Sequence, residues 1–466
     1  MRTERRCGMN EKDEFDLLLE KIFELLEEKR YRAARDVLVE ENPADTAEVI
    51  EEIMDEVGLD EAIIVFRMLP KDISVDVFSY IDTDDQIAII NRITDKEISY
   101  IIDELDFDDK IDVLEELPAN VVDKILEKTP KHERRQINTF LNYPDNCAGT
   151  LMTPDYISLQ KTMTVGEALD YIRKEGMDSE TIYTCYVKDK GRKLYGIISL
   201  RVLVTSDTDT PILDLLETDF VSINVYEDQE EVAETFQKYG YLSIPVVDKE
   251  DRLVGIITMD DIFDVIEEET TEDIERMAGV VDSSNQEYLD ISVFKHVKNR
   301  LPWLLVLMLS YVITGSIITH YEAALSSVIA LVAYMPMLMG TGGNSGSQSA
   351  TLVIRGISVG DLDTNDALRV LWKELRVSFI IGVVLSAVNF LRIYVFEHQT
   401  MGVAITVCAA MIVIVIAAKC IGSMLPLIAK KIGIDPALMA SPMIASLTDM
   451  VSVTSYFMMA TMILHV

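Results

Sequence analysis

Cysteine and histidine are scarce in this sequence of 466 residues, with five of each. The cysteines are odd in number and scattered, so they predict neither a disulfide framework nor a zinc site. They are Cys7, Cys147, Cys185, Cys408 and Cys420. The sequence also lacks a histidine cluster, a nucleophile–base pair and a glycine-rich phosphate loop, which argues against an enzyme, including one regulated by an attached domain.

Basic residues are also few, since 42 lysines and arginines face 79 acids and the formal net charge is -37. The bases do not cluster in the first 300 residues, and phosphate would be repelled, so we expect no nucleic-acid partner. A field this negative concentrates cations, although an acidic surface can also serve solubility alone. The charged start of the chain, through Asp16, has no apolar core, so we expect the N-terminal part to stay in the cytosol.

Long apolar runs are abundant, but only in one part of the chain. Eight acids and eight bases follow residue 300, which leaves 71 of the 79 acids and 34 of the 42 bases before it. The whole excess of negative charge therefore lies in the first 300 residues. A neutral apolar part joined to a strongly acidic part predicts a membrane domain attached to a soluble domain.

A repeat of 12 residues begins at Leu69. Its units start at Leu69-Pro70, Ile81-Asp82, Ile93-Thr94, Leu105-Asp106, Leu117-Pro118 and Thr129-Pro130. Each unit has a proline or a small capping residue, then acids, then an apolar stretch, which is typical of a short helix and its start. A short helix cannot bury its own apolar face, so we expect neighbouring units to stack into an all-α superhelix.

From Met152 the pattern changes to alternating strands and helices, in two similar halves. Residues 194–199 recur as residues 253–258, 59 positions later. The opening Met152-Thr153-Pro154 and the run from Gly255 to Asp261 resemble a tandem of CBS modules. The resemblance implies an α/β regulatory pair that binds adenine nucleotides such as ATP, with Thr258 and Asp261 on the ribose. The first copy has Val202 in place of the acid, so one intact site at most is implied.

A run of acids follows the second half. Eight acids lie within 14 residues and no base stands among them. They are Asp260, Asp261, Asp264, Glu267, Glu268, Glu269, Glu272 and Asp273. On a helix, each pair of like charges three or four residues apart costs about 0.2–0.5 kcal/mol. A bound divalent cation would remove that cost; the alternative is a solvated helix end.

Five apolar segments in the second part predict five membrane spans. They are residues 302–319, 323–354, 377–391, 401–418 and 437–464. An amphipathic helix from Asp290 to Arg300 is expected to connect the soluble part to the first span. Bases gather before the first span, between the second and third, and between the fourth and fifth. The positive-inside rule then places the N-terminus in the cytosol and the C-terminus outside a plasma (inner) membrane.

Two features within the predicted spans carry chemistry. The run from Pro336 to Gln348 has four glycines in seven residues, which predicts a broken helix whose free carbonyls join the amides of Asn344 and Gln348 around a cation. The alternative is close packing of helices through small residues.

The second feature is Asp449, the one acid after residue 437. A charge at the bilayer centre costs at least about 2.5–3.5 kcal/mol, so such residues mark ion or proton pathways. Ser441, Ala445 and Ser452 share its helix face and predict a small polar wall for a hydrated ion. The alternatives are a structural carboxylate paired with Lys419, and a proton relay in a coupled carrier for Co2+ or Mn2+.

The membrane segments resemble the MgtE family of magnesium channels. The matching features are the glycine-rich run after Pro336, Ile354-Arg355-Gly356, the turn Gly433-Ile434-Asp435-Pro436-Ala437, and Thr448-Asp449. The resemblance implies a homodimer with the ion path between its two copies, ion selection at Asp449, and closure by cytosolic Mg2+. The implied regulatory ligands are Asp261, Asp264, Glu269, Glu272, Asp273 and Asp435, with Asp106, Asp108 and Asp109 on the N-terminal domain.

The sequence therefore predicts a multidomain membrane protein in four parts. They are an acidic helical-repeat domain (residues 1–146), a tandem CBS domain (147–268), a linking helix that plugs the pore (269–300), and a five-helix transmembrane bundle (301–466). Mg2+ is expected as both the transported and the regulatory ion. The bilayer, a second copy of the chain and an adenine nucleotide are the other expected partners.

Overall fold

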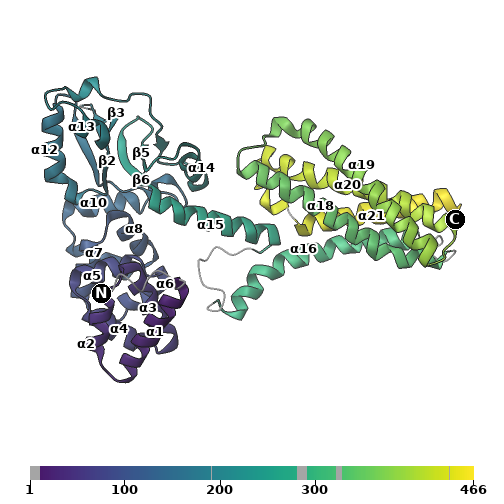
Figure 1. The fold of residues 1–466 in the computed structure, drawn as a ribbon, viewed down its shortest axis with the longest axis horizontal. Helices are drawn as coiled ribbons and strands as arrows, with labels where there is room; N and C mark the ends of the chain where they lie inside the picture. The colour runs from purple at the N-terminus through teal and green to yellow at the C-terminus, as the bar shows by residue number, and fades with distance from the viewer. Residues whose placement is uncertain (1–10, 190, 281–290, 322–327, 440, 466) are drawn as a thin grey trace. The chain divides into compact units, whose positions relative to one another are not determined.

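The computed structural model describes residues 11–189, 191–280, 291–321, 328–439 and 441–465 (Figure 1). The chain forms two compact units, Met1–Val265 and Ile266–Val466. Within the described ranges, the first unit contains all the strands and many short helices, whereas the second is helical.

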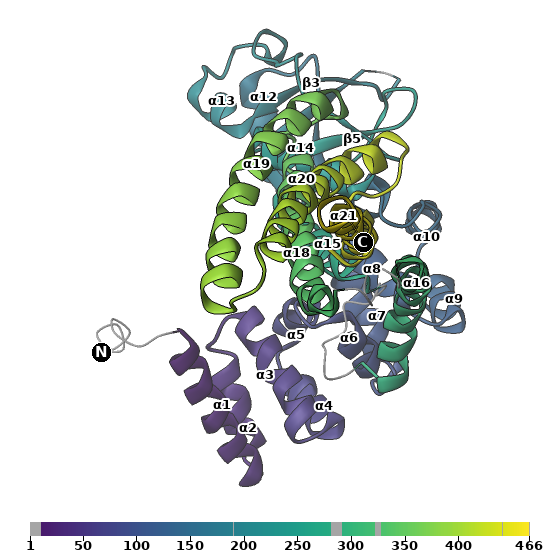
Figure 2. The ribbon, with the colours of Figure 1, turned by 90° about the vertical axis from the view of Figure 1, so that its right-hand side faces the viewer.

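Ten helices form the N-terminal part of the first unit. They are α1 (Glu11–Glu27), α2 (Tyr31–Leu38), α3 (Pro43–Glu56), α4 (Leu59–Met68), α5 (Lys71–Ser79), α6 (Thr83–Ile90), α7 (Asp95–Glu104), α8 (Phe107–Glu116), α9 (Ala119–Lys128) and α10 (Lys131–Phe140). Helices α5 to α10 begin 12 residues apart, which confirms the helical repeat. Figure 2 shows α1 to α4 packed beside one another, and each contacts at least one of the others. The superhelix stays a prediction.

Local chemistry explains where these helices begin. Pro70, Pro118 and Pro130 each stand directly before a helix with extended backbone, so proline ends one unit and starts the next. Thr94 instead forms a capping box with Glu97, in which each residue's side chain accepts a hydrogen bond from the other's backbone N–H.

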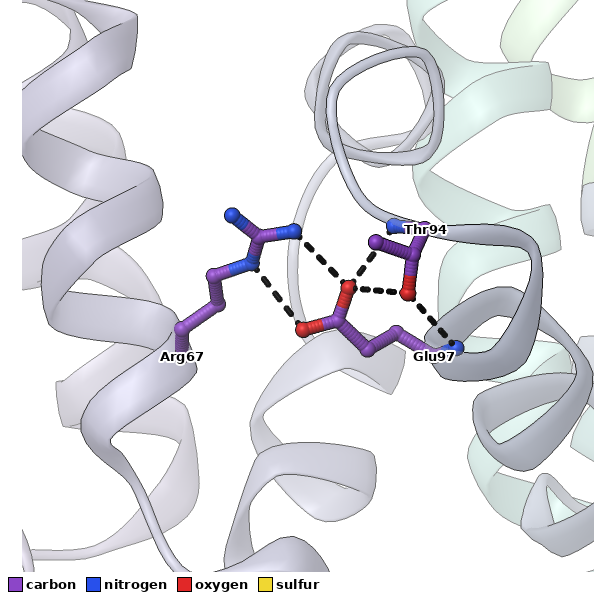
Figure 3. Close-up of polar contacts among 3 residues, drawn as sticks. All are labelled: Arg67, Thr94 and Glu97. Carbon is purple, nitrogen blue, oxygen red and sulfur yellow. Dashed lines mark hydrogen bonds and ion pairs between the residues drawn. The ribbon is translucent and has the colours of Figure 1, made fainter.

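Glu97 also joins α7 of the repeat to α4, which precedes the repeat (Figure 3). Its carboxylate accepts hydrogen bonds from Nε and Nη2 of Arg67 on α4, at 3.0 and 2.8 Å, while it caps α7. The bidentate bond from Arg67, together with the bonds from Thr94, lowers the pKa of Glu97 to about 2. This carboxylate is thus matched by a base, in contrast to the acids described below.

The CBS-like part contains two three-stranded sheets. The strands are β1 (Tyr156–Gln160), β2 (Thr181–Lys188), β3 (Leu194–Ser199), β4 (Ile223–Asn224), β5 (Ser243–Val247) and β6 (Leu253–Thr258), and the helices are α11 (Ala148–Leu151), α12 (Val165–Glu175), α13 (Leu200–Thr205) and α14 (Gln229–Tyr239). In each sheet the first strand runs parallel to the second and the third antiparallel to it. Strands β3 and β6 coincide with the two copies of the 59-residue repeat.

The two sheets meet through reciprocal hydrogen bonds. The N–H of Leu194 donates to the carbonyl of Asp251, and the N–H of Leu253 donates to the carbonyl of Arg192, both at 3.1 Å. The donors of the two bonds lie 59 residues apart, as do the acceptors, so the two similar halves are related by a pseudo-twofold axis. These bonds hold the first residues of β3 and β6 in place. Strand β6 then leads directly into the acidic helix.

The acidic run forms a single helix, α15 (Met259–Ala278). The connecting helix expected over Asp290–Arg300 is not separate from the first span, because α16 runs without a break from Val293 to His320 with Pro302 inside it. Ser292 caps α16 by accepting a hydrogen bond from the N–H of Lys295. Asp290 itself lies outside the described residues.

The second unit is a bundle in which α18 (Met335–Ser358), α19 (Ala367–Leu391), α20 (Met401–Lys431) and α21 (Ser441–Leu464) lie side by side (Figure 1). Four helical segments of the described ranges are long and apolar enough to cross a membrane: Val293–His320, Thr364–Phe396, Met401–Lys431 and Ala437–Leu464. The other predicted span, residues 323–354, begins outside the described residues and corresponds to α18. Its glycines and polar residues make α18 less apolar than these four.

The prediction of a broken helix at the glycine-rich run is wrong. Residues 335–358 form a regular α-helix of 24 residues, so backbone carbonyls are not freed for an ion. Glycine's weak helix propensity costs about 1 kcal/mol per residue, whereas an unpaired backbone group in an apolar medium costs several. The backbone therefore stays helical.

The glycines instead allow neighbouring helices to approach closely. A Cβ on Gly422 of α20 would lie 2.1 Å from the carbonyl oxygen of Gly346 on α18, and a Cβ on Gly346 would lie 2.7 Å from Ile444 of α21. Such distances leave no room for any side chain. The alternative reading, close packing through small residues, is thus the one that the structure supports.

We predict that Gly422→Ala destabilises the bundle, because its methyl group would meet backbone that cannot move aside. The expected cost is about 1–3 kcal/mol, measured as a lower Tm in detergent by fluorescence-detected size exclusion. Gly340→Ala is the matched control, since Gly340 lies in α18 with no atom within 4 Å of the added Cβ. An equal Tm for the two variants would contradict the prediction.

Candidate ion-binding sites

The predicted acidic ligands fall into separate groups in the structure. Asp106, Asp108 and Asp109 belong with Asp261 and Asp264, in the first unit. Glu269, Glu272, Asp273 and Asp435 belong to the second unit, as do Asp449 and Asn344. No three acidic, histidine or cysteine side chains in the described part of the chain lie close enough together to form a ready metal site.

The first group forms where α8 meets the start of α15. Asp106 stands at the N-cap of α8 and Asp109 lies in its first turn, whereas Asp261 and Asp264 lie in the first two turns of α15. Asp109 interacts electrostatically with Asp106, Asp260 and Asp264. The fold therefore gathers carboxylates from sequence positions about 150 residues apart, without a base among those named.

Burial and mutual repulsion raise the pKa values of this group. Burial raises the pKa of Asp108 to about 8, and Glu180 and Asp109 add to the rise. Burial likewise raises the pKa of Asp109 to about 6 and that of Asp261 to about 7, with neighbouring carboxylates contributing. Such a group of carboxylates could bind a hard divalent cation, which would remove the repulsion between their negative charges.

Glu180 belongs to this group and was missed by the sequence analysis. Burial raises its pKa to about 7, with further contributions from Asp106, Asp261, Asp260 and Asp109. It lies directly before β2, outside any run of acids. The sequence around Glu180 does not indicate a role in this group. Only the packing of α8 against the CBS-like part brings its side chain near the other carboxylates.

Thr258 and Asp261, the residues expected on a nucleotide ribose, lie together at the end of β6. The Thr258 hydroxyl donates to Oδ2 of Asp261 at 2.7 Å, and only 5% of Thr258 is exposed. The same Asp261 carboxylate interacts electrostatically with Asp108 and Asp260. A nucleotide and a cation would therefore compete for one side chain.

The second group surrounds Arg276, near the end of α15. Arg276 forms ion pairs with Glu272 on its own helix and with Asp435 in the turn before α21, where its Nη1 lies 2.6 Å from Oδ2. Oδ1 of Asp435 accepts a hydrogen bond from the N–H of Ala437 at 2.7 Å. Burial raises the pKa of Asp273, and Asp435 beside it adds to the rise. Glu269 also interacts electrostatically with Arg276.

Arg276 is the second residue that the sequence analysis missed. Its guanidinium lies between two of the carboxylates that were expected to share a metal ion. The signal was present in the sequence, since Arg276 is a base three residues after the acidic run and four after Glu272, a spacing that pairs side chains on one helix face.

The third group lies in the membrane bundle. Asp449 is half-buried on α21, and within the described ranges its carboxylate has no hydrogen-bonding or ionic partner. Asn344 and Gln348 are exposed on α18, on the side away from the glycines that pack on α20 and α21. The bundle thus presents a carboxylate and two amides that its own helices do not satisfy.

The polar wall predicted beside Asp449 is only partly present. Thr448 and Ser452 are 1% exposed, and both lie against glycines of α18. Ala445 likewise faces Gly343, since a Cβ added to that glycine would lie 3.7 Å from it. The helix face assigned to a hydrated ion is therefore mainly a surface for helix packing. The side chain of Ser441 lies outside the described residues.

Lys419, considered as a partner of Asp449, is bound elsewhere. Its ammonium donates to the Ser349 hydroxyl at 3.2 Å and lies 4.0 Å from the carboxylate of Glu374. Lys419 is thus paired with Ser349 and Glu374 and not with Asp449.

Three family models match this chain. The model described as divalent cation transporter matches residues 335–459, the MgtE intracellular N domain matches residues 41–146, and the CBS domain matches residues 148–208 and 212–268.

Similar proteins cover nearly the whole chain. A magnesium transporter MgtE from Thermus thermophilus is 35% identical over 446 residues, which are 95% of this chain and 97% of that protein. One from Bacillus subtilis is 31% identical over 451 residues, 97% of this chain and 98% of the relative. The crystal structure of the cytosolic domain of the Mg2+ channel MgtE in complex with ATP is 33% identical, with a TM-score of 0.49, and covers 53% of this chain and 99% of its own.

We predict that the first group makes stability fall as pH rises. The raised pKa values mean that the folded state holds more protons than the unfolded state between about pH 4 and 8, so stability is lost across that window. Asp108→Asn should raise the Tm at pH 8 and change it little at pH 4, measured on the full chain in detergent. A gain of a few degrees is expected, at about 2–4 °C per kcal/mol.

Asp72→Asn is the control for this comparison, because Asp72 is exposed on α5. If Asp108→Asn and Asp72→Asn shifted the Tm equally at both pH values, the raised pKa of Asp108 would be contradicted.

Proposed function

This chain belongs to the MgtE family of divalent cation transporters, and from that premise we propose that it is a Mg2+-selective channel closed by its own acidic N-terminal part. Members of the family transport cations and are not enzymes. The apolar helices of the second unit make this chain a multi-pass membrane protein. Mg2+ is the transported substrate named for the relatives.

The observation that carries the proposal is the unpartnered carboxylate of Asp449. An ionised group within a membrane helix is costly unless it is paired or lies on a hydrated path. The nearby base is engaged by Ser349 and Glu374 and does not neutralise it. Asp449 therefore binds the ion on its way through the membrane.

Exposed amides support a pore between two copies of the chain. Asn344 and Gln348 are polar and exposed on a helix of the membrane bundle, where lipid cannot satisfy them. A second copy that faces this side would enclose these amides, and in the proposal the ion path also includes Asp449 of each copy. In such a homodimer, two Asp449 carboxylates would hold Mg2+ through its waters, because this ion dehydrates reluctantly and usually keeps several of them.

Helix α18 completes five spans in this proposal. Its 24 residues span about 36 Å at about 1.5 Å per residue, enough to cross a hydrocarbon core of about 30 Å. With five spans and bases on one side, the N-terminus lies in the cytosol and the C-terminus outside the plasma membrane. The four parts proposed from the sequence, residues 1–146, 147–268, 269–300 and 301–466, are retained.

Two groups of carboxylates serve as the proposed sensor of cytosolic Mg2+. Asp106, Asp108 and Asp109 with Asp261 and Asp264 form one, to which Glu180 is added, and Glu269, Glu272, Asp273 and Asp435 form the other. At low Mg2+ the carboxylates of each group repel one another, and a bound cation draws them together. Tighter binding by the closed state shifts the population toward it.

Adenine nucleotide binding at Thr258 and Asp261 is a further part of the proposal. The hydroxyl and carboxylate lie side by side at the end of β6, where a hydrogen bond of 2.7 Å joins them, and this supports a shared ligand. Because Asp261 also belongs to the acidic group, ATP and regulatory Mg2+ would influence each other's binding. If ATP and Mg2+ both need the Asp261 carboxylate, each ligand would weaken the binding of the other.

We predict that Asp449→Ala abolishes Mg2+ uptake into liposomes. Loss of one charge-assisted contact costs about 1.5–3 kcal/mol, which is about tenfold or more in affinity, and a homodimer loses two. Asp361→Ala is the control, because Asp361 is an exposed acid outside the apolar segments. Uptake by Asp449→Ala at the control rate would refute the assignment, and uptake that moves protons would favour the coupled carrier.

We predict that Asp261→Ala and Glu272→Ala leave the channel open at high cytosolic Mg2+, since each removes a carboxylate from one of the two sensor groups. Patch recordings would measure the open fraction as Mg2+ is raised on the cytosolic side. Asp72→Ala, at an exposed acid of α5, should close as the wild type does. Normal closure by both sensor variants would rule out these groups as the sensor.

A further inference from the structure

A buried polar cluster joins three helices of the membrane bundle. The ammonium of Lys419 on α20 donates to the hydroxyl of Ser349 on α18 at 3.2 Å, and that hydroxyl donates to Oε2 of Glu374 on α19 at 2.7 Å. The ammonium lies 4.0 Å from the same carboxylate oxygen. A serine on α18 is thus placed between opposite charges on its two neighbours.

The cluster is closed to solvent and to ions. Ser349 is 0% exposed, Lys419 is 4% exposed, and the Glu374 side chain is 13% exposed. Removing one member of a buried ion pair leaves the other charge uncompensated, which is strongly unfavourable. The three side chains therefore stay together, and they serve a role different from that of Asp449, which has no such partner.

The position of Ser349 on α18 indicates what the cluster controls. Ser349 lies one turn after Ser345 and Gly346, on the buried face of α18, and the turn before it packs on α20 and α21 through glycines. Glycines allow close approach, but without side chains they interlock poorly and resist rotation of a helix about its axis only weakly. The bonds at Ser349 supply the directional contact that the glycines lack.

We propose that Lys419 and Glu374 are positioning residues that act through Ser349 to fix the rotation of α18, and thereby hold Asn344 and Gln348 on the exposed face of the bundle. The inference rests on the proposed function, in which the face of α18 that carries Asn344 and Gln348 lines the ion path. The pair itself does not touch the ion. It sets the direction in which the amides of α18 point.

The test measures the rotation of α18 directly and does not depend on transport. In full-length protein without its native cysteines, Gln348→Cys on the exposed face and Ala350→Cys on the buried face are labelled in turn with a methanethiosulfonate reagent. Lys419→Met or Glu374→Gln should slow labelling at position 348 and speed it at position 350, each severalfold. Lys419→Arg, which keeps the charge, should restore the wild-type rates.

The double variant Lys419→Met/Glu374→Gln leaves no uncompensated charge but still lacks the charged bonds to Ser349, so it should keep the shifted labelling. Ser349→Ala keeps the ion pair and removes only the bridge, so it should shift labelling even where the single charge variants fold poorly. Unchanged labelling in Ser349→Ala and in the folded fraction of the charge variants would overturn the proposal and leave the cluster a purely stabilising role.

The labelling experiment also distinguishes a failure of this inference from a failure of the proposed transport function. If wild-type protein did not transport Mg2+, the labelling pattern and its shift in these variants would persist. Asp449→Ala, in turn, should abolish uptake and leave labelling at both positions unchanged.

Discussion

Repulsion between buried carboxylates is the interaction on which the proposed regulation of this protein depends. In the first unit, residues of α8 and of the start of α15 bring together acids such as Asp108 and Asp109. Burial raises the pKa of Asp108 to about 8 and that of Asp109 to about 6. Such a group is unfavourable until something positive joins it. Because hard divalent cations prefer carboxylate oxygens as ligands, the repulsion would serve the proposed regulation as a means of sensing that cation.

The second acidic group differs in one respect that changes its response to cations. Arg276 already neutralises Glu272 and Asp435, so this group begins from an ion pair. A Mg2+ ion that binds there would share or displace the guanidinium, whereas one that binds near Asp109 would displace only protons and water. The two groups are thus expected to bind Mg2+ with different strengths, although both belong to the proposed sensor.

The sequence predicted the elements well wherever local chemistry decides them. Prolines such as Pro70 and the capping residue Thr94 mark helix starts, and the 59-residue repeat marks matching strands, because both signals lie within a few residues of the feature. Long-range packing was the source of the misses. Glu180 joins the acidic group only through the fold, and the glycine-rich helix stays regular because a membrane penalises a broken backbone more than it penalises glycine. The low helix propensity of glycine, which is measured in water, therefore led to the wrong prediction of a broken helix at Gly346 and its neighbours.

Charges within the membrane bundle separate into two kinds, and the separation assigns their roles. Lys419 and Glu374 compensate each other across Ser349, so their sum is neutral and they can remain buried without an ion. Asp449 has no partner in the described part of the chain, so its charge needs an ion or water whenever it is ionised. In the proposed function, a cation passing through the bundle would be attracted to the uncompensated site and would gain little from the compensated one. The bundle can therefore use one pair of charges to hold its shape and another charge to bind its substrate.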